Sequence, residues 1–221
     1  MARTIPVTPF QGVPPKFDKL FLYTPQPRRC REPFGARRRI RFILSTVPTM
    51  ILEQRCKAIR LILSDVDGVL TDGRLVFDNQ GIETKHFHVR DGLGVRLWQR
   101  AGYRFGLLTH RSSHIVKVRA AELGISILRQ GTDDKLAALR GILRELQLTP
   151  ADVCYLGDDL PDLPVVRAVG LGVAVADACG ELRQAAHYVT TCGGGAGAIR
   201  ETIELILKAQ SRWDDVIQTY R

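Results

Sequence analysis

From residue 50 onward, short apolar runs alternate with amphipathic stretches. The apolar runs, which have the length and composition of buried strands, are residues 60–64, 104–108, 126–128, 153–156 and 170–175. The stretches with helical spacing are residues 91–101, 112–123, 133–147, 160–168 and 180–186. Alternation of strand and helix produces right-handed crossovers, so the pattern predicts an α/β fold with a mostly parallel sheet covered by helices on both faces.

One segment interrupts this alternation after the first strand. Residues 74–89 predict two short strands around the turn-forming residues 78–81, so we expect a small β-hairpin insertion. Its apolar side chains, exposed in any simple arrangement, are Leu75, Val76, Phe77 and Phe87. A two-stranded hairpin is marginally stable alone in water, so we expect hairpins of neighbouring subunits to pair and form a lip over the site.

The end of the chain carries a second apolar face. Its members, spaced as one side of a helix, are Trp213, Val216, Ile217 and Tyr220. We therefore expect the tail, residues 208–221, to dock on its own domain or on a neighbour. The main globular domain is expected over residues 50–207.

Charge and proline are concentrated at the start of the chain. The formal net charge is +9, yet residues 1–49 alone hold ten Lys or Arg against two acids, and eight of the eleven prolines. We expect a disordered basic extension there. It could bind an acidic surface, act as a targeting sequence, or precede a translation start at Met50, which we favour. Nucleic-acid binding by this extension is an alternative, but residues 50–221 are nearly neutral and we expect no such partner.

Cysteine and hydropathy patterns point to the cytoplasm. The five cysteines, an odd number without a metal-binding spacing, are Cys30, Cys56, Cys154, Cys179 and Cys192, and we expect free thiols in a reducing compartment. The apolar residues 40–52 are too short to span a bilayer, and Pro48 interrupts them. We expect no membrane partner.

Two carboxylates end the first strand. Asp65 and Asp67 are spaced i, i+2 and are followed by Gly68. Carboxylates this close repel each other, which raises at least one pKa unless a cation lies between them. Mg²⁺, which prefers oxygen ligands, is the usual remedy. By itself the pair fits an Asp-rich turn after a strand equally well.

Other polar residues also follow predicted strands or begin helices. Thr109 follows the second strand, Asp158 and Asp159 follow the fourth, and Lys135 lies in the first turn of a helix that Thr132 or Asp133 could cap. Ligands of parallel sheets bind outside the carboxyl ends of the strands, so these residues are expected at one edge. Asp159 and Asp162 could equally be caps of the next helix.

The order of these motifs resembles the haloacid dehalogenase superfamily of phosphatases. The motifs are Asp-x-Asp-Gly at 65–68, Thr109, Lys135 and Gly-Asp-Asp-x-x-Asp at 157–162. More narrowly, residues 57–210 are similar to the 3-deoxy-D-manno-octulosonate 8-phosphate phosphatases. The stretches that carry this similarity are residues 65–73, 89–92, 130–131, 134–136, 157–162 and 173–178. The resemblance implies a Rossmann-like sheet and a phosphatase domain over residues 50–207.

The resemblance also implies a role for each motif residue. Asp65 would be the nucleophile that forms an aspartyl-phosphate, and Asp67 would be the general acid and base. Asp65, Asp158 and the main-chain carbonyl of Asp67 would hold Mg²⁺. Thr109 and Lys135 would hold the phosphoryl oxygens. Asp159 and Asp162 would support the metal or Lys135.

A phosphorylated sugar acid would be the substrate, and arginine suits recognition of its carboxylate. By resemblance, the substrate-binding residues are Asp67, His88, Val89, Arg90, Asp91, Gly92, Arg96, Arg111, Arg119 and Lys135. The related phosphatases usually carry Asn at the position of His88 and Gly at that of His110. These two differences border the expected site and bear on the choice of sugar acid.

The function implied is Mg²⁺-dependent hydrolysis of 3-deoxy-D-manno-octulosonate 8-phosphate in lipopolysaccharide biosynthesis, by a homotetramer. One alternative is a phosphatase for a nine-carbon, sialic-type acid 9-phosphate. A non-catalytic oligomerisation domain is the other, although such a module has no need of an acid and base beside a nucleophile.

Overall fold

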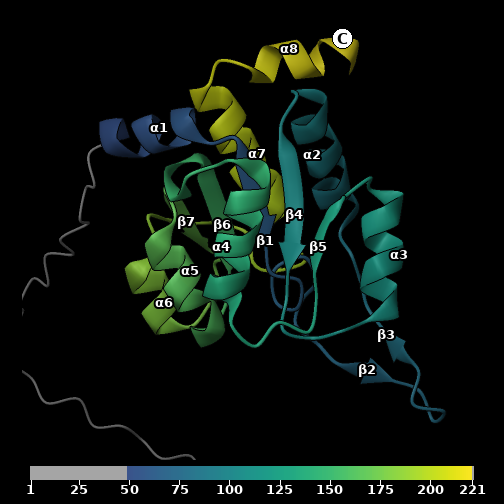
Figure 1. Ribbon diagram of the computed structural model, residues 1–221. Helices are drawn as coiled ribbons and strands as arrows, with labels where there is room; N and C mark the ends of the chain where they lie inside the picture. The colour runs from purple at the N-terminus through teal and green to yellow at the C-terminus, as the bar shows by residue number, and fades with distance from the viewer. Residues whose placement is uncertain (1–48, 221) are drawn as a thin grey trace, which may run out of the picture. The chain divides into compact units, whose positions relative to one another are not determined.

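The computed structural model describes residues 49–220, which contain a six-stranded sheet in the order β5-β4-β1-β6-β7-β8 (Figure 1). The strands are β1 (Leu61–Ser64), β4 (Arg104–Leu108), β5 (Ile127–Arg129), β6 (Val153–Gly157), β7 (Leu171–Ala174) and β8 (Tyr188–Val189). Every neighbouring pair is parallel. The expected basic extension lies outside the described residues, apart from Thr49.

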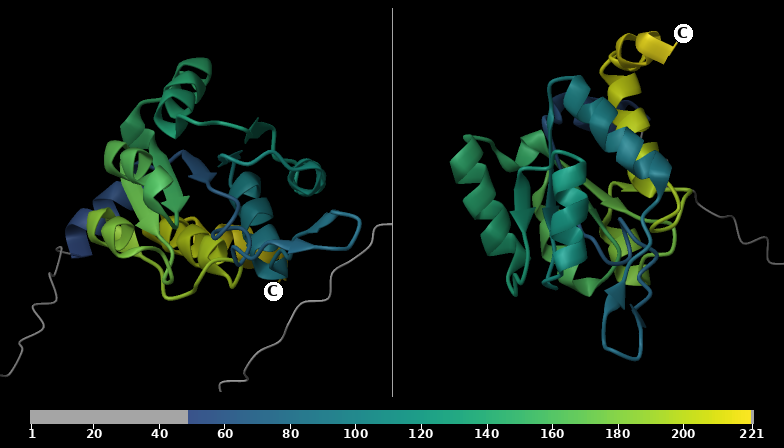
Figure 2. Two further views of the ribbon diagram at one scale, coloured as in Figure 1. Left: turned by 90° about the horizontal axis from the view of Figure 1, so that it is seen from below. Right: turned by 90° about the vertical axis from the view of Figure 1, so that its right-hand side faces the viewer.

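Helices cover both faces of this sheet, which confirms the predicted α/β class. They are α1 (Thr49–Ala58), α2 (Val89–Arg100), α3 (His114–Glu122), α4 (Lys135–Leu146), α5 (Leu163–Ala168), α6 (Gly180–Ala185), α7 (Ala198–Ala209) and α8 (Trp213–Ile217). Helix α5 packs between α4 and α6 on one face, and α7 packs against α1 and α2 on the other (Figures 1 and 2). Strands β1 and β6 are buried along their whole length, as expected for strands covered on both sides.

Several elements differ from the sequence prediction. Helix α1 and the short strand β8 were not predicted, because α1 lacks a clear apolar stripe and β8 has only two residues. The stretch 160–168 is divided into a 3-10 turn at Leu160–Asp162 and helix α5. Pro161 and Pro164, which lack an N–H group, stand at the beginnings of these two pieces.

The predicted hairpin is present and projects away from the main sheet (Figure 1). Strands β2 (Val76–Phe77) and β3 (Glu83–Thr84) pair antiparallel. The Asp78 carboxylate closes the turn by accepting hydrogen bonds from the backbone N–H groups of Gln80 and Ile82. Leu75, Val76, Phe77 and Ile82 are exposed, whereas Phe87, which was expected to be exposed, is half-buried against the core.

The C-terminal tail docks on its own domain. Val216 is buried, and the Trp213 ring lies beneath the cationic groups of Arg200 and Lys208 from helix α7. Tyr220, the last member of the predicted apolar face, remains exposed. Across residues 49–220, none of the helices combines the length and the apolar character that crossing a bilayer requires.

Candidate active site

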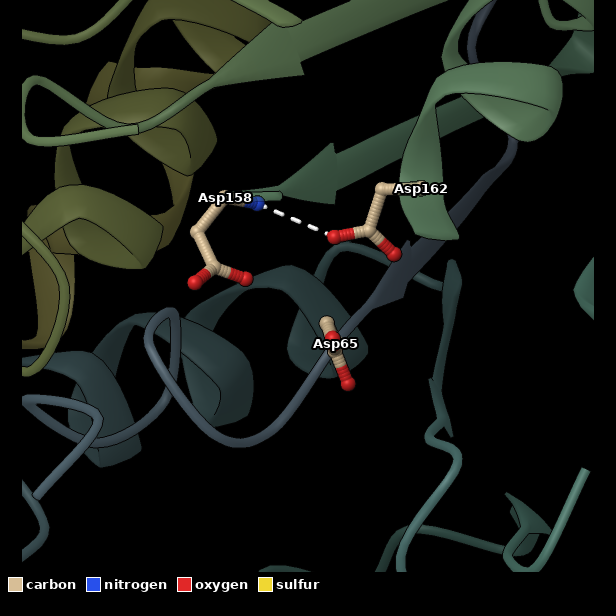
Figure 3. A group of neighbouring side chains, drawn as sticks. All are labelled: Asp65, Asp158 and Asp162. Carbon is tan, nitrogen blue, oxygen red and sulfur yellow. Dashed lines mark hydrogen bonds between the residues drawn. The ribbon is translucent and has the colours of Figure 1, made fainter. Parts of the chain in front are cut away.

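Three strand ends bring polar side chains to one edge of the sheet. Asp65 follows β1, Thr109 follows β4 and Asp158 follows β6. Because β1 lies between β4 and β6, these residues are neighbours at the carboxyl edge, where parallel sheets bind ligands. Carboxylate oxygens of Asp65, Asp158 and Asp162 lie within 4.8 Å of one another (Figure 3).

The turn after β1 is shaped by glycine. Gly68 has a φ of +85°, and a Cβ atom built on it would overlap the carboxylate of Asp158. The glycine-rich loop 193–197 packs on the other side of this turn, where the backbone N–H of Gly195 donates to the carbonyl of Val69 at 2.9 Å. Close approach of the Asp158 carboxylate and of this loop's backbone fixes the turn that carries the two aspartates.

Lys135 is the buried cation of this cluster. Its Nζ atom lies 2.6 Å from Oδ2 of Asp65 and 2.6 Å from Oδ1 of Asp162. Burial by itself lowers the pKa of Lys135, but the two carboxylates outweigh burial and raise the pKa above its ordinary value. The helix begins with Asp134 as its N-cap, where Thr132 or Asp133 had been predicted, and the Asp134 carboxylate accepts from Ala137 N–H.

Asp162 supports its neighbours with both carboxylate oxygens. Oδ1 accepts from Lys135 and from the Tyr155 hydroxyl at 2.6 Å, and Oδ2 accepts from the Asp158 backbone N–H at 3.0 Å. Asp159 has a different place, because its exposed carboxylate caps the 3-10 turn by accepting from Leu160 N–H. Of the two, Asp162 therefore belongs to the cluster and Asp159 to the helix end.

The remaining carboxylates suit a divalent cation. Burial, together with repulsion from neighbouring carboxylates, raises the pKa of Asp65 to about 6 and that of Asp158 to about 7. Within residues 49–220, no donor holds the Asp158 carboxylate, whereas the oxygens of Asp162 are occupied. Asp65 and Asp158 thus provide oxygen ligands whose mutual repulsion a hard cation such as Mg²⁺ would relieve.

Asp67, the second aspartate of the turn, contacts cations rather than the other carboxylates. Lys85 Nζ donates to its Oδ1 atom, and Arg111 Nη1 lies 3.6 Å from Oδ2. Lys85 was not among the residues expected at the site. Its only signal in the sequence is the i, i+2 spacing from Glu83, which places both side chains on one side of an extended segment.

Comparison with known proteins agrees with this arrangement. A model of the haloacid dehalogenase-like hydrolase family matches residues 99–199. The 3-deoxy-D-manno-octulosonate 8-phosphate phosphatase of Yersinia pestis is 48% identical over 159 residues, which are 72% of this chain and 85% of that protein. The chain belongs to the haloacid dehalogenase-like hydrolases. The predicted family is thereby confirmed, and this hydrolase is a phosphomonoesterase.

Solved structures of similar proteins share the fold of this hydrolase. The 3-deoxy-D-manno-octulosonate 8-phosphate phosphatase of Moraxella catarrhalis, in complex with a magnesium ion, a phosphate ion and KDO, matches with a TM-score of 0.76 and 46% identity. The match covers 77% of this chain and 98% of that one. A probable YrbI family phosphatase from Pseudomonas syringae also matches with a TM-score of 0.76, at 49% identity over 78% and 98% of the two chains.

In the hydrolase, two of the expected substrate-binding residues stand at the start of helix α2. His88 is the N-cap residue, and its Nδ1 atom lies 4.0 Å from Oδ2 of Asp91. Asp91 is fully buried, and its Oδ1 atom accepts from Arg200 N–H at 2.8 Å. Asp91 therefore connects α2 to the first turn of α7, and burial raises its pKa.

Other expected substrate-binding residues of the hydrolase lie on a separate groove between α2 and α3. Val89, Gly92, Arg96 and Arg119 line this groove. Arg119 pairs with Glu122 and lies over the Phe87 ring, and Arg96 donates to the Glu122 carbonyl. Arg90 is exposed and lines a different hollow, beside Arg200. Among the residues that the structure describes, the side-chain partners of Arg96 and Arg119 lie on α3 and the segment before α2, away from the carboxylate cluster.

Proposed function

We propose that this enzyme is a Mg²⁺-dependent phosphatase that converts 3-deoxy-D-manno-octulosonate 8-phosphate into the free sugar acid and inorganic phosphate. The observation that carries the proposal is the buried bridge of Lys135 between Asp65 and Asp162, beside the Asp158 carboxylate, which accepts no hydrogen bond within residues 49–220. The similar phosphatases from Yersinia pestis and Moraxella catarrhalis support the choice of substrate, and the ions in the latter support magnesium.

Asp65 would attack phosphorus. Its Oδ1 atom accepts from Val66 N–H at 2.6 Å and its Oδ2 atom from Lys135, so the carboxylate is fixed at the strand end. As the Asp65 oxygen bonds to phosphorus, the bond from phosphorus to the sugar oxygen breaks. Asp67 gives its proton to the leaving sugar oxygen.

Hydrolysis of the resulting aspartyl-phosphate completes the cycle. Asp67, now a carboxylate, takes a proton from water, whose oxygen bonds to phosphorus while the bond to Asp65 breaks. Inorganic phosphate leaves, and Asp67 is again protonated. Mg²⁺ held by Asp65, Asp158 and the Asp67 carbonyl would neutralise the charge that otherwise repels a phosphate dianion.

Thr109 and Lys135 would hold the transferred phosphoryl group. Phosphoryl transfer depends mostly on positioning and on electrostatic stabilisation. Lys135 already lies against the nucleophile, and Thr109 is buried at the end of the neighbouring strand β4. A buried ammonium acts more strongly on the phosphoryl oxygens than an exposed one, because little water screens it.

The proposal extends to assembly and cellular role. The exposed hairpin residues Leu75, Val76, Phe77 and Ile82 support pairing of hairpins between subunits of a homotetramer. The reaction would supply the eight-carbon sugar acid for lipopolysaccharide biosynthesis in the cytoplasm. A monomer by light scattering at micromolar concentration would contradict the assembly proposed.

Phosphate release from 3-deoxy-D-manno-octulosonate 8-phosphate with Mg²⁺ tests the function directly. A sialic-type acid 9-phosphate and a generic hexose phosphate are measured beside it, and Asp65→Asn is the inactive control. We expect the octulosonate ester to be cleaved fastest and Asp65→Asn to abolish turnover. Faster cleavage of the nine-carbon ester would identify that ester as the substrate instead. If none of the esters is cleaved, the proposal is contradicted.

A further inference from the structure

One face of the extended segment formed by strand β3 and the residues after it is turned toward the proposed active site. Glu83 and Lys85 are two residues apart, so their side chains share a face, and Thr84 and His86 on the other face are exposed. The Lys85 side chain is only 1% exposed. Lysines normally keep the ammonium in water and bury only the aliphatic stem. The burial of the whole Lys85 side chain at the base of a projecting hairpin therefore requires an explanation.

Four charges of alternating sign explain this burial. Lys85 Nζ contacts Oδ1 of Asp67 and lies 3.2 Å from Oε1 of Glu83. Arg111 Nη2 lies 2.7 Å from the same Glu83 oxygen, and Ser113 donates to the other Glu83 oxygen at 3.1 Å. Buried charges persist only when they are paired in good geometry, and here each anion contacts two cations.

The two oxygens of Asp67 have different surroundings. Oδ1 is held by the Lys85 ammonium, whereas the closest Arg111 nitrogen is 3.6 Å from Oδ2, beyond hydrogen-bond distance. Glu83 restrains both cations from the opposite side. The arrangement fixes the orientation of the Asp67 carboxyl group, and among residues 49–220 it leaves Oδ2 without a direct hydrogen bond.

We propose that Lys85 is a positioning residue for Asp67: its ammonium, anchored by Glu83, binds Oδ1 and thereby directs Oδ2 toward the leaving oxygen of the substrate. The inference rests on the proposed function, because Asp67 acts as an acid only in that reaction. It also assigns the hairpin a part in the chemistry, beyond any part in assembly.

Substrates whose leaving groups differ in basicity can show whether Lys85 positions Asp67 or only supports the fold. A sugar alkoxide needs a proton as it leaves, whereas para-nitrophenolate leaves without one. Hydrolysis of the aspartyl-phosphate is common to both substrates and also uses Asp67, so the comparison is made on kcat/KM, which reports only the steps up to transfer of the phosphoryl group to Asp65. We expect Lys85→Met to lower kcat/KM for the sugar phosphate by about 10- to 100-fold, within the range of general acid catalysis, and kcat/KM for para-nitrophenyl phosphate by less than about threefold. Lys85→Arg, which keeps the charge, should recover most of the loss. An equal loss on both substrates would overturn the proposal.

A double-mutant cycle with Asp67→Asn provides an independent test. If Lys85 acts through Asp67, adding Lys85→Met to Asp67→Asn should lower kcat for the sugar phosphate by less than about threefold further. Multiplication of the two single effects would contradict the proposal. Arg74→Met, which removes an exposed cation from the same hairpin segment, is the matched control and should leave both activities unchanged.

Two further measurements separate failure of this proposal from failure of the proposed substrate. If the wild-type enzyme cleaves aryl phosphates but not the octulosonate ester, the substrate proposal fails. The role of Lys85 is then measured with aryl phosphates of increasing phenol pKa, for which Lys85→Met should steepen the fall in kcat/KM. Should Lys85→Met not fold, Glu83→Gln, which loosens the anchor, should show the same selective loss in weaker form. Equal losses on all esters would overturn the proposal.

Discussion

The ammonium of Lys135 lies 2.6 Å from Oδ1 of Asp162, and both side chains are almost completely removed from water. The same ammonium is 2.6 Å from the Asp65 carboxylate. Asp162 therefore holds the cation in place, and the cation holds Asp65, the proposed nucleophile. Breaking a buried ion pair of this kind strongly destabilises the fold, because the surviving partner is left buried without its counter-charge.

Asp162→Ala is expected to destabilise the fold. It leaves Lys135, the Tyr155 hydroxyl and the Asp158 backbone N–H without their acceptor, which should lower the free energy of unfolding by about 2–4 kcal/mol. Urea denaturation followed by circular dichroism measures this. Asp159→Asn is the matched control, because asparagine caps a helix as well as aspartate, and its change should stay below about 0.5 kcal/mol. Similar losses in both variants would contradict the role given to Asp162.

The stability of the metal-free protein should fall as pH rises from about 4 to about 7. The pKa of Asp158 is raised from 3.8 to about 7 in the fold by burial and by repulsion from Asp162 and Asp65, so its stabilising contribution is complete below 3.8 and is lost as pH rises through 7. Mg²⁺ competes with protons for these carboxylates. Stabilisation by Mg²⁺ should therefore increase across the same window, which thermal melts with Mg²⁺ and with a chelator would show.

Asp158→Asn should remove this response. At pH 8 without metal, the variant should be more stable than wild type by about 1 kcal/mol. This value is smaller than the pKa shift alone would give, because water screens the partly exposed side chain. It should also gain little from Mg²⁺. A melting temperature that rises with Mg²⁺ as much as that of the wild type would show that the cation binds elsewhere.

Gly68→Ala should disturb the site through one methyl group. Alanine rarely adopts the positive φ of residue 68, and its Cβ atom would overlap the Asp158 carboxylate. We expect loss of Mg²⁺-dependent stabilisation and at least about a tenfold fall in kcat, equivalent to about 1.4 kcal/mol. Gly141→Ala is the control, since nothing lies near its Cβ position in helix α4, and it should raise the free energy of unfolding by about 0.5–1 kcal/mol. Equal effects of the two substitutions would contradict this account.

Phe77→Ser tests the assembly proposed through the hairpin. Phe77 is more than half exposed at the end of β2, so its loss should leave the fold intact and shift the light-scattering mass toward smaller species. Val118→Ser, at an equally exposed apolar position on helix α3, should leave the mass unchanged. Unchanged masses for both variants would argue against a hairpin interface.

Much of this architecture could be predicted from the sequence because it rests on local patterns. Apolar runs identified the five longer strands, and turn-forming residues around Asp78 identified the hairpin. Asp65, Thr109 and Asp158 could be assigned to one edge because the carboxyl ends of parallel strands meet there. Helix α1 and strand β8 were not predicted, because a weakly amphipathic helix and a two-residue strand carry little periodic signal.

Only the tertiary structure decided which partner each charged side chain meets. Asp91 reaches the start of α7, more than a hundred residues further along the chain. Lys85 contacts not only its neighbour Glu83 but also Asp67, which lies 18 residues earlier. The sequence determines which side of a strand or helix a side chain occupies, because backbone periodicity is local. Pairing of buried charges depends on how separate elements pack, since each charge must find its partner across the folded chain.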